Sequence, residues 1–222
     1  MNLLAIAISV LMSIGIATGS AGLATSTNSA ILGTKTQVLA ERSFSLEKRY
    51  NNKFVSDIFK DNILLTLAYM DGKVKSAADV NWTEIEKPQE FTLTLKPGEL
   101  FTFHPDVLPQ YIGKTLKTTN AHFNAADGFK TDGLYFGDGV CHIASLIYWA
   151  AKDAGLDAYR PAAHDFAVIN EVPKEYGVSI FYVPGNTEAN AHQNLYVVNN
   201  RQSDIRFVFT NDGTNLSVRI VE

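Results

Sequence analysis

The residue type best suited to covalent chemistry occurs once in this sequence, at Cys141. The cysteine follows a Gly-Asp-Gly-Val turn that begins at Gly137, and it falls in the first turn of a predicted helix. Unpaired amide groups and the helix dipole favour an anion at such a position. They can lower the pKa of a thiol from about 8.5 to 7.5 or less, as a cysteine nucleophile requires. The alternative is a buried cysteine that only fills space, because cysteine is among the most buried residue types.

A nucleophilic cysteine needs a general base, and the chain has five histidines. His164 lies at a predicted transition from loop to strand and is the first candidate for this base. His192 is an alternative base. We expect Asn194 or Asn199 to be the third member of the group, the residue that orients the imidazole.

The other histidines are candidates for ligand binding rather than for catalysis. His142 follows Cys141 directly, but successive helical side chains point about 100 degrees apart, so it is a poor base for its neighbour. The stretch from residue 104 to 135 is irregular and rich in Pro and Gly, and so long a loop is a candidate wall of a site. The predicted ligand-binding residues are Arg160, His142, Tyr148, His104 and His122.

Composition and motifs exclude several classes of function. The sequence has no His-Glu-x-x-His, Cys-x-x-Cys or His-x-x-x-His pattern, so we expect no metal and no other cofactor. The turn Gly137-Asp138-Gly139 alone does not make a phosphate loop. The formal net charge is -4, which gives no electrostatic basis for binding a nucleic acid. With one cysteine, no intramolecular disulfide can form.

The elements that must position these residues are predicted by hydrophobic spacing. Apolar residues recur at helical intervals over residues 55–70 and again over 140–154, where Gly155 follows as a cap. Alternation predicts strands at residues 91–95, 178–182, 195–198, 205–209 and 216–220, the last two as a hairpin. These elements predict an α+β domain, in which an N-terminal helix and the Cys-bearing central helix pack on a mainly antiparallel sheet.

The start of the chain has a different character, because its first 34 residues include no charged residue. The apolar run at residues 3–17 is shorter than the roughly 20 residues of a spanning helix, and small residues follow it, as in a secretory signal. We expect a signal peptide or an N-terminal membrane anchor over residues 1–24, a linker over 25–43, a helical segment over 44–90 and a domain over 91–222. The protein would then be extracytoplasmic, either secreted or anchored, with membrane contact only through this segment.

Several ordered motifs resemble one known family. Residues 137–148 read Gly-Asp-Gly-Val-Cys-His-Ile-Ala-Ser-Leu-Ile-Tyr, and Ala-Gly-Leu at 154–156, Arg160 and His164 follow. This order resembles the VanW family, and Leu-Lys-Pro-Gly-Glu at 95–99 is similar to that family's opening strand and turn. The resemblance covers residues 91–222 and implies an accessory protein of the cell envelope, of the type found in vancomycin-resistance gene clusters. Asp138 and His142 depart from the family's Gly and Gln at their positions.

Functions of different classes remain open at this point. In the first, Cys141 is the nucleophile and His164 the base of a cysteine-dependent amidase or acyl transferase that acts on envelope peptides. In the second, Arg160 and the loop over 104–135 belong to a non-catalytic module that binds a cell-wall peptide or another envelope component, and the cysteine is structural. A third is a purely structural partner for another envelope protein. The distance between the sulfur and an imidazole separates the enzyme from the others.

Overall fold

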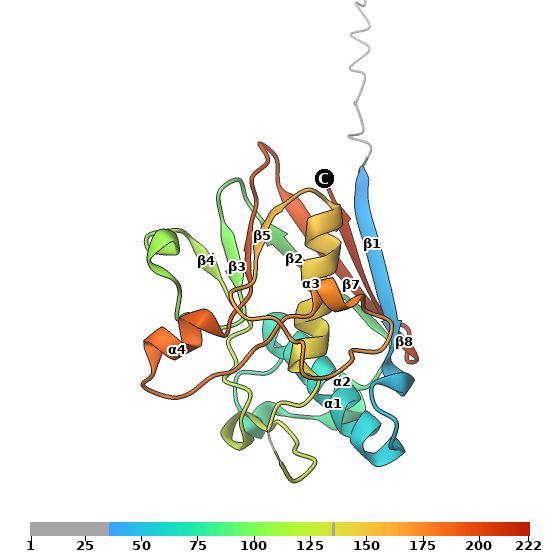
Figure 1. Ribbon diagram of the computed structural model, residues 1–222. Helices are drawn as coiled ribbons and strands as arrows, with labels where there is room; N and C mark the ends of the chain where they lie inside the picture. Colours follow the sequence, from blue (N-terminus) through green and yellow to red (C-terminus); the bar gives the residue numbers. More distant parts are fainter. Residues whose placement is uncertain (1–35, 135) are drawn as a thin grey trace, which may run out of the picture. The chain divides into compact units, whose positions relative to one another are not determined.

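The computed structural model describes residues 36–134 and 136–222 (Figure 1). Residues Thr36–Glu222 form one compact unit. The predicted export segment over residues 1–24 lies outside the described residues. Within the described part of the chain, no helix combines the length and the apolar character needed to cross a membrane.

Four α-helices, five single-turn 3-10 helices and eight strands make up the regular structure of the described residues. The helices are α1 (Lys53–Met70), α2 (Trp82–Ile85), α3 (Val140–Asp153) and α4 (Thr187–His192). The strands are β1 (Val38–Ser45), β2 (Gln89–Leu95), β3 (Leu100–Thr102), β4 (Leu116–Lys117), β5 (Asp157–Tyr159), β6 (Tyr196–Val198), β7 (Ile205–Asn211) and β8 (Asn215–Val221).

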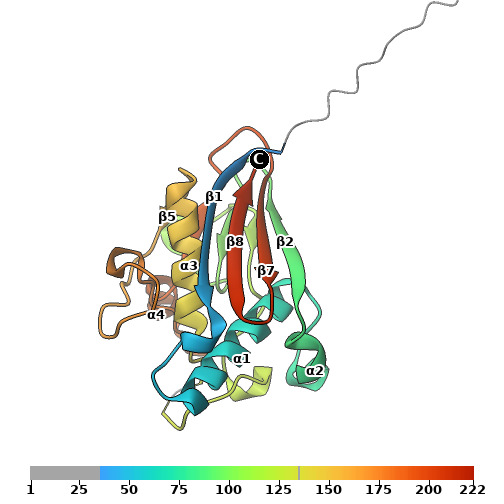
Figure 2. The same cartoon turned by 90° about the vertical axis from the view of Figure 1, so that its right-hand side faces the viewer.

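The strands form two sheets of four, and α3 packs between them. One sheet has the order β1-β8-β7-β2 and is antiparallel throughout, as Figure 2 shows face on. The other has the order β4-β3-β6-β5, in which β3 and β4 run parallel and the other pairs antiparallel. Helix α3 contacts β1 and β8 of the first sheet and β5 of the second. This arrangement confirms the predicted α+β class.

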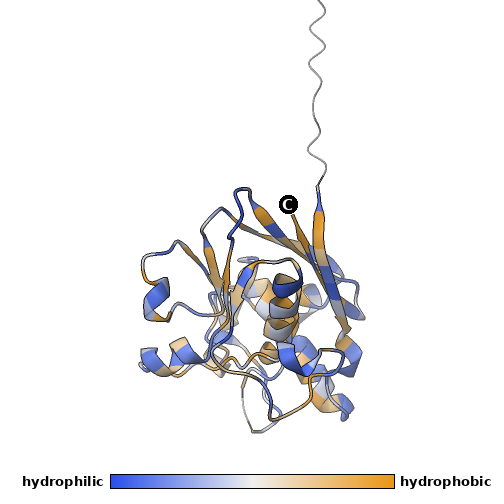
Figure 3. Ribbon diagram, turned by 45° about the horizontal axis from the view of Figure 1, so that its top comes forward, coloured by the Kyte–Doolittle hydropathy of each residue, from blue (hydrophilic) through white to orange (hydrophobic). Residues whose placement is uncertain are grey.

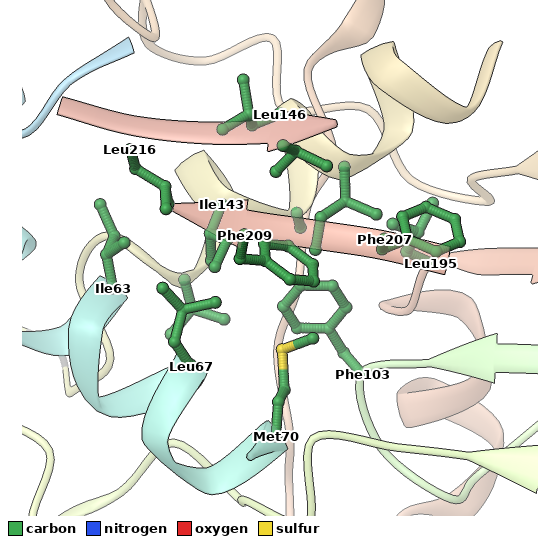
Figure 4. Packing of buried hydrophobic residues seen from close by; sticks show 14 of the residues in the cluster. Ile63, Leu67, Met70, Phe103, Ile143, Leu146, Leu195, Phe207, Phe209 and Leu216 are labelled. Atoms are coloured by element: carbon green, nitrogen blue, oxygen red, sulfur yellow. The ribbon is translucent and has the colours of Figure 1, made fainter. Parts of the chain in front are cut away.

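The core fills the space between α1, α3 and the sheets. Hydrophobic and hydrophilic residues alternate along the long strands (Figure 3). Because successive side chains of a strand point to opposite faces, one face of the first sheet is mainly apolar. Side chains from α1, α3, β7 and β8 meet over this face (Figure 4). The labelled contributors are Ile63, Leu67 and Met70 from α1, Ile143 and Leu146 from α3, and Phe103, Leu195, Phe207, Phe209 and Leu216 from strands and adjoining loops.

Both predicted helices are confirmed, with small shifts at their ends. Helix α1 begins two residues earlier than Val55, because the side chain of Asn52 caps it by accepting a hydrogen bond from the Val55 amide at 3.3 Å. Helix α3 ends at Asp153, and Gly155 follows in the left-handed region with φ of 71°. The predicted hairpin is formed by β7 and β8.

Two predictions about extended segments were wrong. Residues 38–43 belong to β1, which pairs with β8, and are not linker. Only Ala40 and Phe44 of this strand are buried, so the strand has few core positions at which the sequence could show apolar alternation. Residues 178–182 do not form a strand of either sheet. Their amides bond to helical side chains instead, as described below.

Candidate functional site

The start of α3 is held by contacts from α1. The side chain of Asn62 donates to the carbonyl oxygens of Lys130 at 3.0 Å and Asp138 at 2.9 Å, and its oxygen accepts the Lys130 amide at 2.8 Å. Gly139 caps the helix with φ of 97°. A Cβ atom at this position would lie 2.5 Å from the carbonyl oxygen of Phe59, so only glycine lets the two helices approach this closely. The Gly-Asp-Gly-Val turn is therefore fixed by α1.

The sulfur of Cys141 is engaged by backbone groups of an extended segment. The thiol donates to the carbonyl oxygen of Ile180 at 3.6 Å, and the Ile180 amide donates to the sulfur at 3.4 Å. One turn along α3, the hydroxyl of Ser145 accepts the amide of Val178 at 2.8 Å and donates to the carbonyl of Cys141. The side chains of Cys141 and Ser145 thus satisfy the backbone amides of Ile180 and Val178, as the backbone of a neighbouring strand would in a sheet.

This environment raises the pKa of the Cys141 thiol to about 11. Burial is the largest cause, because the thiolate loses its hydration, and the carboxylate of Asp138 adds to the effect. The hydrogen bond from the Ile180 amide acts in the opposite direction and is outweighed. Burial likewise raises the pKa of Asp138 to about 6. The pKa of the Cys141 thiol is therefore raised, although its position at the start of a helix predicted that the pKa would be lowered.

We expect Cys141 to resist alkylation by iodoacetamide in the folded protein. A pKa of about 11, in place of the usual 9.0, leaves about a hundredfold less thiolate at pH 8. The measurement is the rate of carbamidomethylation by mass spectrometry between pH 7 and pH 9, with glutathione as the reference thiol. Unfolding in urea should restore the ordinary rate. Fast labelling of the folded chain at pH 7 would contradict the structure.

Two buried histidines, His142 and His164, lie next to each other, and neither is hydrogen-bonded to the sulfur of Cys141 in the described structure. The rings of His142 and His164 are 6.2 Å apart between centroids and meet edge to face. Each has a buried Nδ1 atom without a hydrogen-bond partner in the described structure. Burial lowers the pKa of both imidazoles, that of His142 strongly, and both are neutral at pH 7. Within the described residues, no imidazole is hydrogen-bonded to Cys141, whose partners are the backbone groups of Ile180.

Acidification should destabilise the fold because of these histidines. Burial also lowers the pKa of His104, so three imidazoles take up a proton more readily in the unfolded chain than in the folded one. Stability is therefore complete above pH 6.5 and falls below it, by up to about 1.4 kcal/mol per pH unit for each proton. Asp138, with its raised pKa, partly offsets this loss. Urea unfolding at a series of pH values measures how the free energy of unfolding changes with pH.

His142→Phe should make the free energy of unfolding less dependent on pH, and the control His192→Gln, at an exposed position, should not. A wild-type free energy of unfolding that stays constant down to about pH 5 would contradict the prediction.

His104 and Asn194 are placed together, away from the sulfur. The Nε2 atom of His104 lies 3.2 Å from the carbonyl oxygen of Gln193, and its Nδ1 lies 3.3 Å from the amide nitrogen of Asn194. Asn194 also accepts the amides of Phe103 and Leu195, so every polar atom of its side chain is used inside the fold. These contacts give Asn194 a structural role in joining two loops.

The remaining predicted residues are spread over other parts of the domain. His122 is half exposed beside Asp127 and packs against the ring of Tyr182. The side chain of Asn199 bonds to the backbone of Leu95, Ser203 and Arg201. His192 is exposed and bonds within α4. Arg160 lies over the ring of Tyr148 at 5.6 Å and donates to the Glu175 carbonyl.

Sequence reasoning missed the loop that runs from His164 to Gly177. Its ends are joined by the His164 amide, which donates to the Gly177 carbonyl at 3.1 Å, and by a bridge between Ala163 and Val178. Such a compact loop with adjacent ends is a frequent carrier of function. Two apolar side chains at its tip are exposed, Phe166 to 76% and Val168 to 84%. The available signal was this Phe-x-Val pair, because two large apolar residues close together in an irregular segment can form an exposed patch that marks a binding surface.

Residues Asn170 and Glu171 of the loop bond to the end of β1 and to the segment that connects β1 with α1. The side chain of Asn170 donates to the Lys48 carbonyl at 2.7 Å. The carboxylate of Glu171 accepts the Ser45 amide at 2.7 Å and pairs with the buried guanidinium of Arg49 at 2.8 Å. These contacts fix the position of Asn170 and Glu171, which follow the exposed residues Phe166 and Val168 in the loop.

The loop encloses a cleft of about 200 Å³. Its lining consists of His164, Asp165, Phe166, Ala167, Val168, Ile169, Val172, Pro173, Lys174 and Gly177. Apolar side chains predominate, and a few polar groups accompany them, which is the usual composition of a ligand pocket. Among the described residues, no group of three or more His, Cys, Asp or Glu side chains could hold a metal ion.

Comparison with known proteins agrees with the motif order around α3. A family model described as VanW like protein matches residues 90–221, which is more than half of the 222-residue chain. This protein belongs to the VanW-like family. The comparison found no significant match among curated proteins or among solved structures. Cys141, all five histidines and the cleft between His164 and Gly177 lie within the VanW-like domain, whereas β1 and α1 lie outside the matched residues and complete its core.

Proposed function

We propose that this VanW-like protein is an exported, non-catalytic accessory module that binds a component of the cell envelope. The observation that carries the proposal is the state of Cys141, whose thiol is hydrogen-bonded to Ile180 and has a pKa of about 11. A thiol with so high a pKa is almost wholly protonated at neutral pH, and the thiolate is the nucleophilic form. Its contacts supply a structural reason for the residue, because they hold the segment 178–180 against α3.

The loop between His164 and Gly177 is the surface best suited to binding. Its apolar tip is exposed, while Asn170 and Glu171 hold its far side in place. A binding surface that is already ordered loses little conformational entropy when it takes up a ligand. The cleft beneath the tip supplies a concave, mainly apolar surface of the kind that small ligands use.

The position of this loop is compatible with an N-terminal tether. The described chain enters β1 beside its own C-terminus, where the amide of Gln37 bonds to the Glu222 carbonyl. The loop contacts the opposite end of β1, at Ser45. Eight strand residues span about 26 Å at roughly 3.3 Å each, so the cleft lies well away from the point where the chain enters the fold.

Retention on purified peptidoglycan sacculi tests the proposal with the full chain. We expect the wild type and Cys141→Ala to sediment with sacculi, and the double variant Phe166→Ala/Val168→Ala to lose at least about tenfold in affinity because apolar contact area is removed. Ile112→Ala is the matched control, since Ile112 is also exposed, to 73%, but lies in another loop.

Two results would overturn the proposal. The first is absence of retention of the wild type. The second is release of soluble wall fragments by the wild type but not by Cys141→Ala, which would identify an enzyme. Circular dichroism of each variant shows that a loss of retention is not a loss of folding.

A further inference from the structure

Two buried imidazoles lie next to each other where the loop between His164 and Gly177 meets α3. The ring of His142 contacts the uncharged ring of Phe59 from α1, at 4.9 Å between centroids, and the ring of His164 at 6.2 Å. The ring of His164 also packs on Phe166, at 4.1 Å between centroids. The Nδ1 atom of each imidazole is buried and has no hydrogen-bond partner within the described residues. A proton added to either ring would therefore place a charge among aromatic side chains.

The surroundings of both rings oppose protonation in the closed loop. Burial lowers the pKa of His142 most, and the buried guanidinium of Arg49 and the imidazole of His164 lower it further. Burial also lowers the pKa of His164, although a backbone contact within the loop and the carboxylate of Asp165 favour its charged form. The carboxylate paired with Arg49 is that of Glu171, which belongs to the same loop as His164. The closed loop therefore keeps both imidazoles neutral.

The two imidazoles differ in how they could reach water. His142 belongs to the first turn of α3, where its amide donates to the Gly139 carbonyl at 3.0 Å, so the helix fixes its position. His164 lies outside any helix or strand, at the beginning of the loop. Movement of the loop would carry the ring of His164 into solvent and would remove it from the ring of His142.

The contacts of the loop indicate which part of it can move. Its last residues are held on α3, because the ring of Tyr176 stacks on Trp149 at 5.6 Å between centroids and meets that of Tyr148 at 6.2 Å. Its middle is held by side-chain hydrogen bonds of Asn170 and Glu171, which cross to another segment of the surface. The residues before this aromatic contact can therefore leave α3 while the end of the loop stays in place.

We propose that residues 164–172 form an acid-sensitive flap. Below about pH 6, protons bind to His164 and His142 and shift the flap from the closed conformation, in which the two rings are adjacent, to an open one in which His164 faces water. The opening is a property of the fold alone. Its effect on binding rests on the proposed function, because Phe166 and Val168 belong to the flap, and we expect acid to weaken that binding.

Hydrogen exchange of the full chain, followed by mass spectrometry at pH 7.5 and pH 5.0, tests the opening. An imidazole that is neutral in the closed flap and has the ordinary pKa of about 6.5 in the open one raises the open population up to about 30-fold over this interval. After correction for the intrinsic pH dependence of exchange, we expect the protection of the flap amides to fall by at least about tenfold. This exchange should not depend on low concentrations of urea, whereas exchange in β7 and β8 should, because a local opening exposes little surface.

Substitution of the two imidazoles by uncharged rings tests whether they cause the opening. In the double variant His142→Phe/His164→Phe the protection of the flap amides should be the same at pH 7.5 and pH 5.0. Each single variant should keep part of the pH dependence, and its folding is checked by circular dichroism. His192→Gln is the matched control, since His192 is exposed on α4, and it should behave as the wild type.

Three results would overturn the flap. The first is equal protection of the flap amides at the two pH values. The second is one protection factor and one urea dependence shared by the flap, β7 and β8, because the loop would then open only with the whole fold. The third is a double variant that loses as much protection in acid as the wild type does, because the imidazoles would then not be the cause.

Retention on sacculi at the two pH values separates the flap from the proposed function. If the flap opens in acid and sacculi do not retain the chain at pH 7.5, the flap stands and the envelope role fails. If sacculi retain the chain at pH 7.5, we expect release at pH 5.0, recovery on return to pH 7.5 and no release of the double variant. Equal retention of the wild type at both pH values would overturn the regulation of binding.

Discussion

Gly139→Ala should destabilise the protein by about 3 kcal/mol or more, the largest effect that we expect from a single methyl group. Two costs combine at this position. Gly139 has φ of 97°, which an alanine rarely adopts, and the new Cβ would lie 2.5 Å from the backbone oxygen of Phe59. Neither backbone can yield easily, because the Asn62 side chain of α1 donates to the Asp138 carbonyl of this turn and exchanges two further hydrogen bonds with the backbone of Lys130. The free energy of unfolding in urea measures the effect.

Gly113→Ala is the matched control for this substitution. Gly113 also has positive φ, at 87°, but no atom lies within 4 Å of its ideal Cβ position. Its replacement should therefore show only the conformational cost, about 1 kcal/mol. If the two variants lost equal stability, the close approach of α1 and α3 would not be what requires glycine at residue 139.

Glu171→Ala should cost about 2–3 kcal/mol of stability because it leaves the charge of Arg49 buried without its partner. Arg49 is only 1% exposed and packs over the ring of Phe44, and burial lowers its pKa to about 10 against the opposing influence of Glu171. We place the cost below the range for a fully buried pair, since the Glu171 side chain is 44% exposed and partly screened by water. The Ser45 amide would lose its acceptor as well.

The same variant should loosen the loop between His164 and Gly177. Hydrogen exchange of the loop amides should become faster in Glu171→Ala than in the wild type, while exchange in β7 and β8 should change little. Lys87→Met is the control, because its pair with Glu84 is exposed on both sides and should contribute little. The double variant Arg49→Met/Glu171→Ala should recover part of the loss; additive losses would show that the two residues are not coupled.

Much of the architecture was predictable because local patterns and tertiary packing agree. The apolar stripe predicted for α3 is buried, whereas α1 is buried on all sides from Asn62 to Met70. The alternating apolar residues of β7 and β8 form the face that the first sheet turns toward α3. The motif order from Gly137 to His164 was sufficient to place the chain in the VanW-like family, which the family match confirms. The export segment and the role of Cys141 in chemistry stay predictions.

The state of the cysteine was not predictable from its neighbours in sequence. Its position at a helix start favours a thiolate, but the residue whose backbone groups bond to the sulfur, Ile180, lies 39 positions away. Residues 178–180 alternate like a strand, and only the tertiary structure shows that Cys141 and Ser145 replace the neighbouring strand.

The sequence by itself determined the fold class, the two long helices and the family. These depend on short-range periodicity and on an ordered motif, which are properties of contiguous residues. The tertiary structure decided the chemistry. In the folded chain the backbone of Ile180 bonds to the sulfur of Cys141, the neutral imidazoles of His142 and His164 lie next to each other, and the loop from His164 to Gly177 lines a cleft. The reason is physical: a pKa depends on burial and on charges within a few ångströms, and those neighbours come from distant parts of the chain.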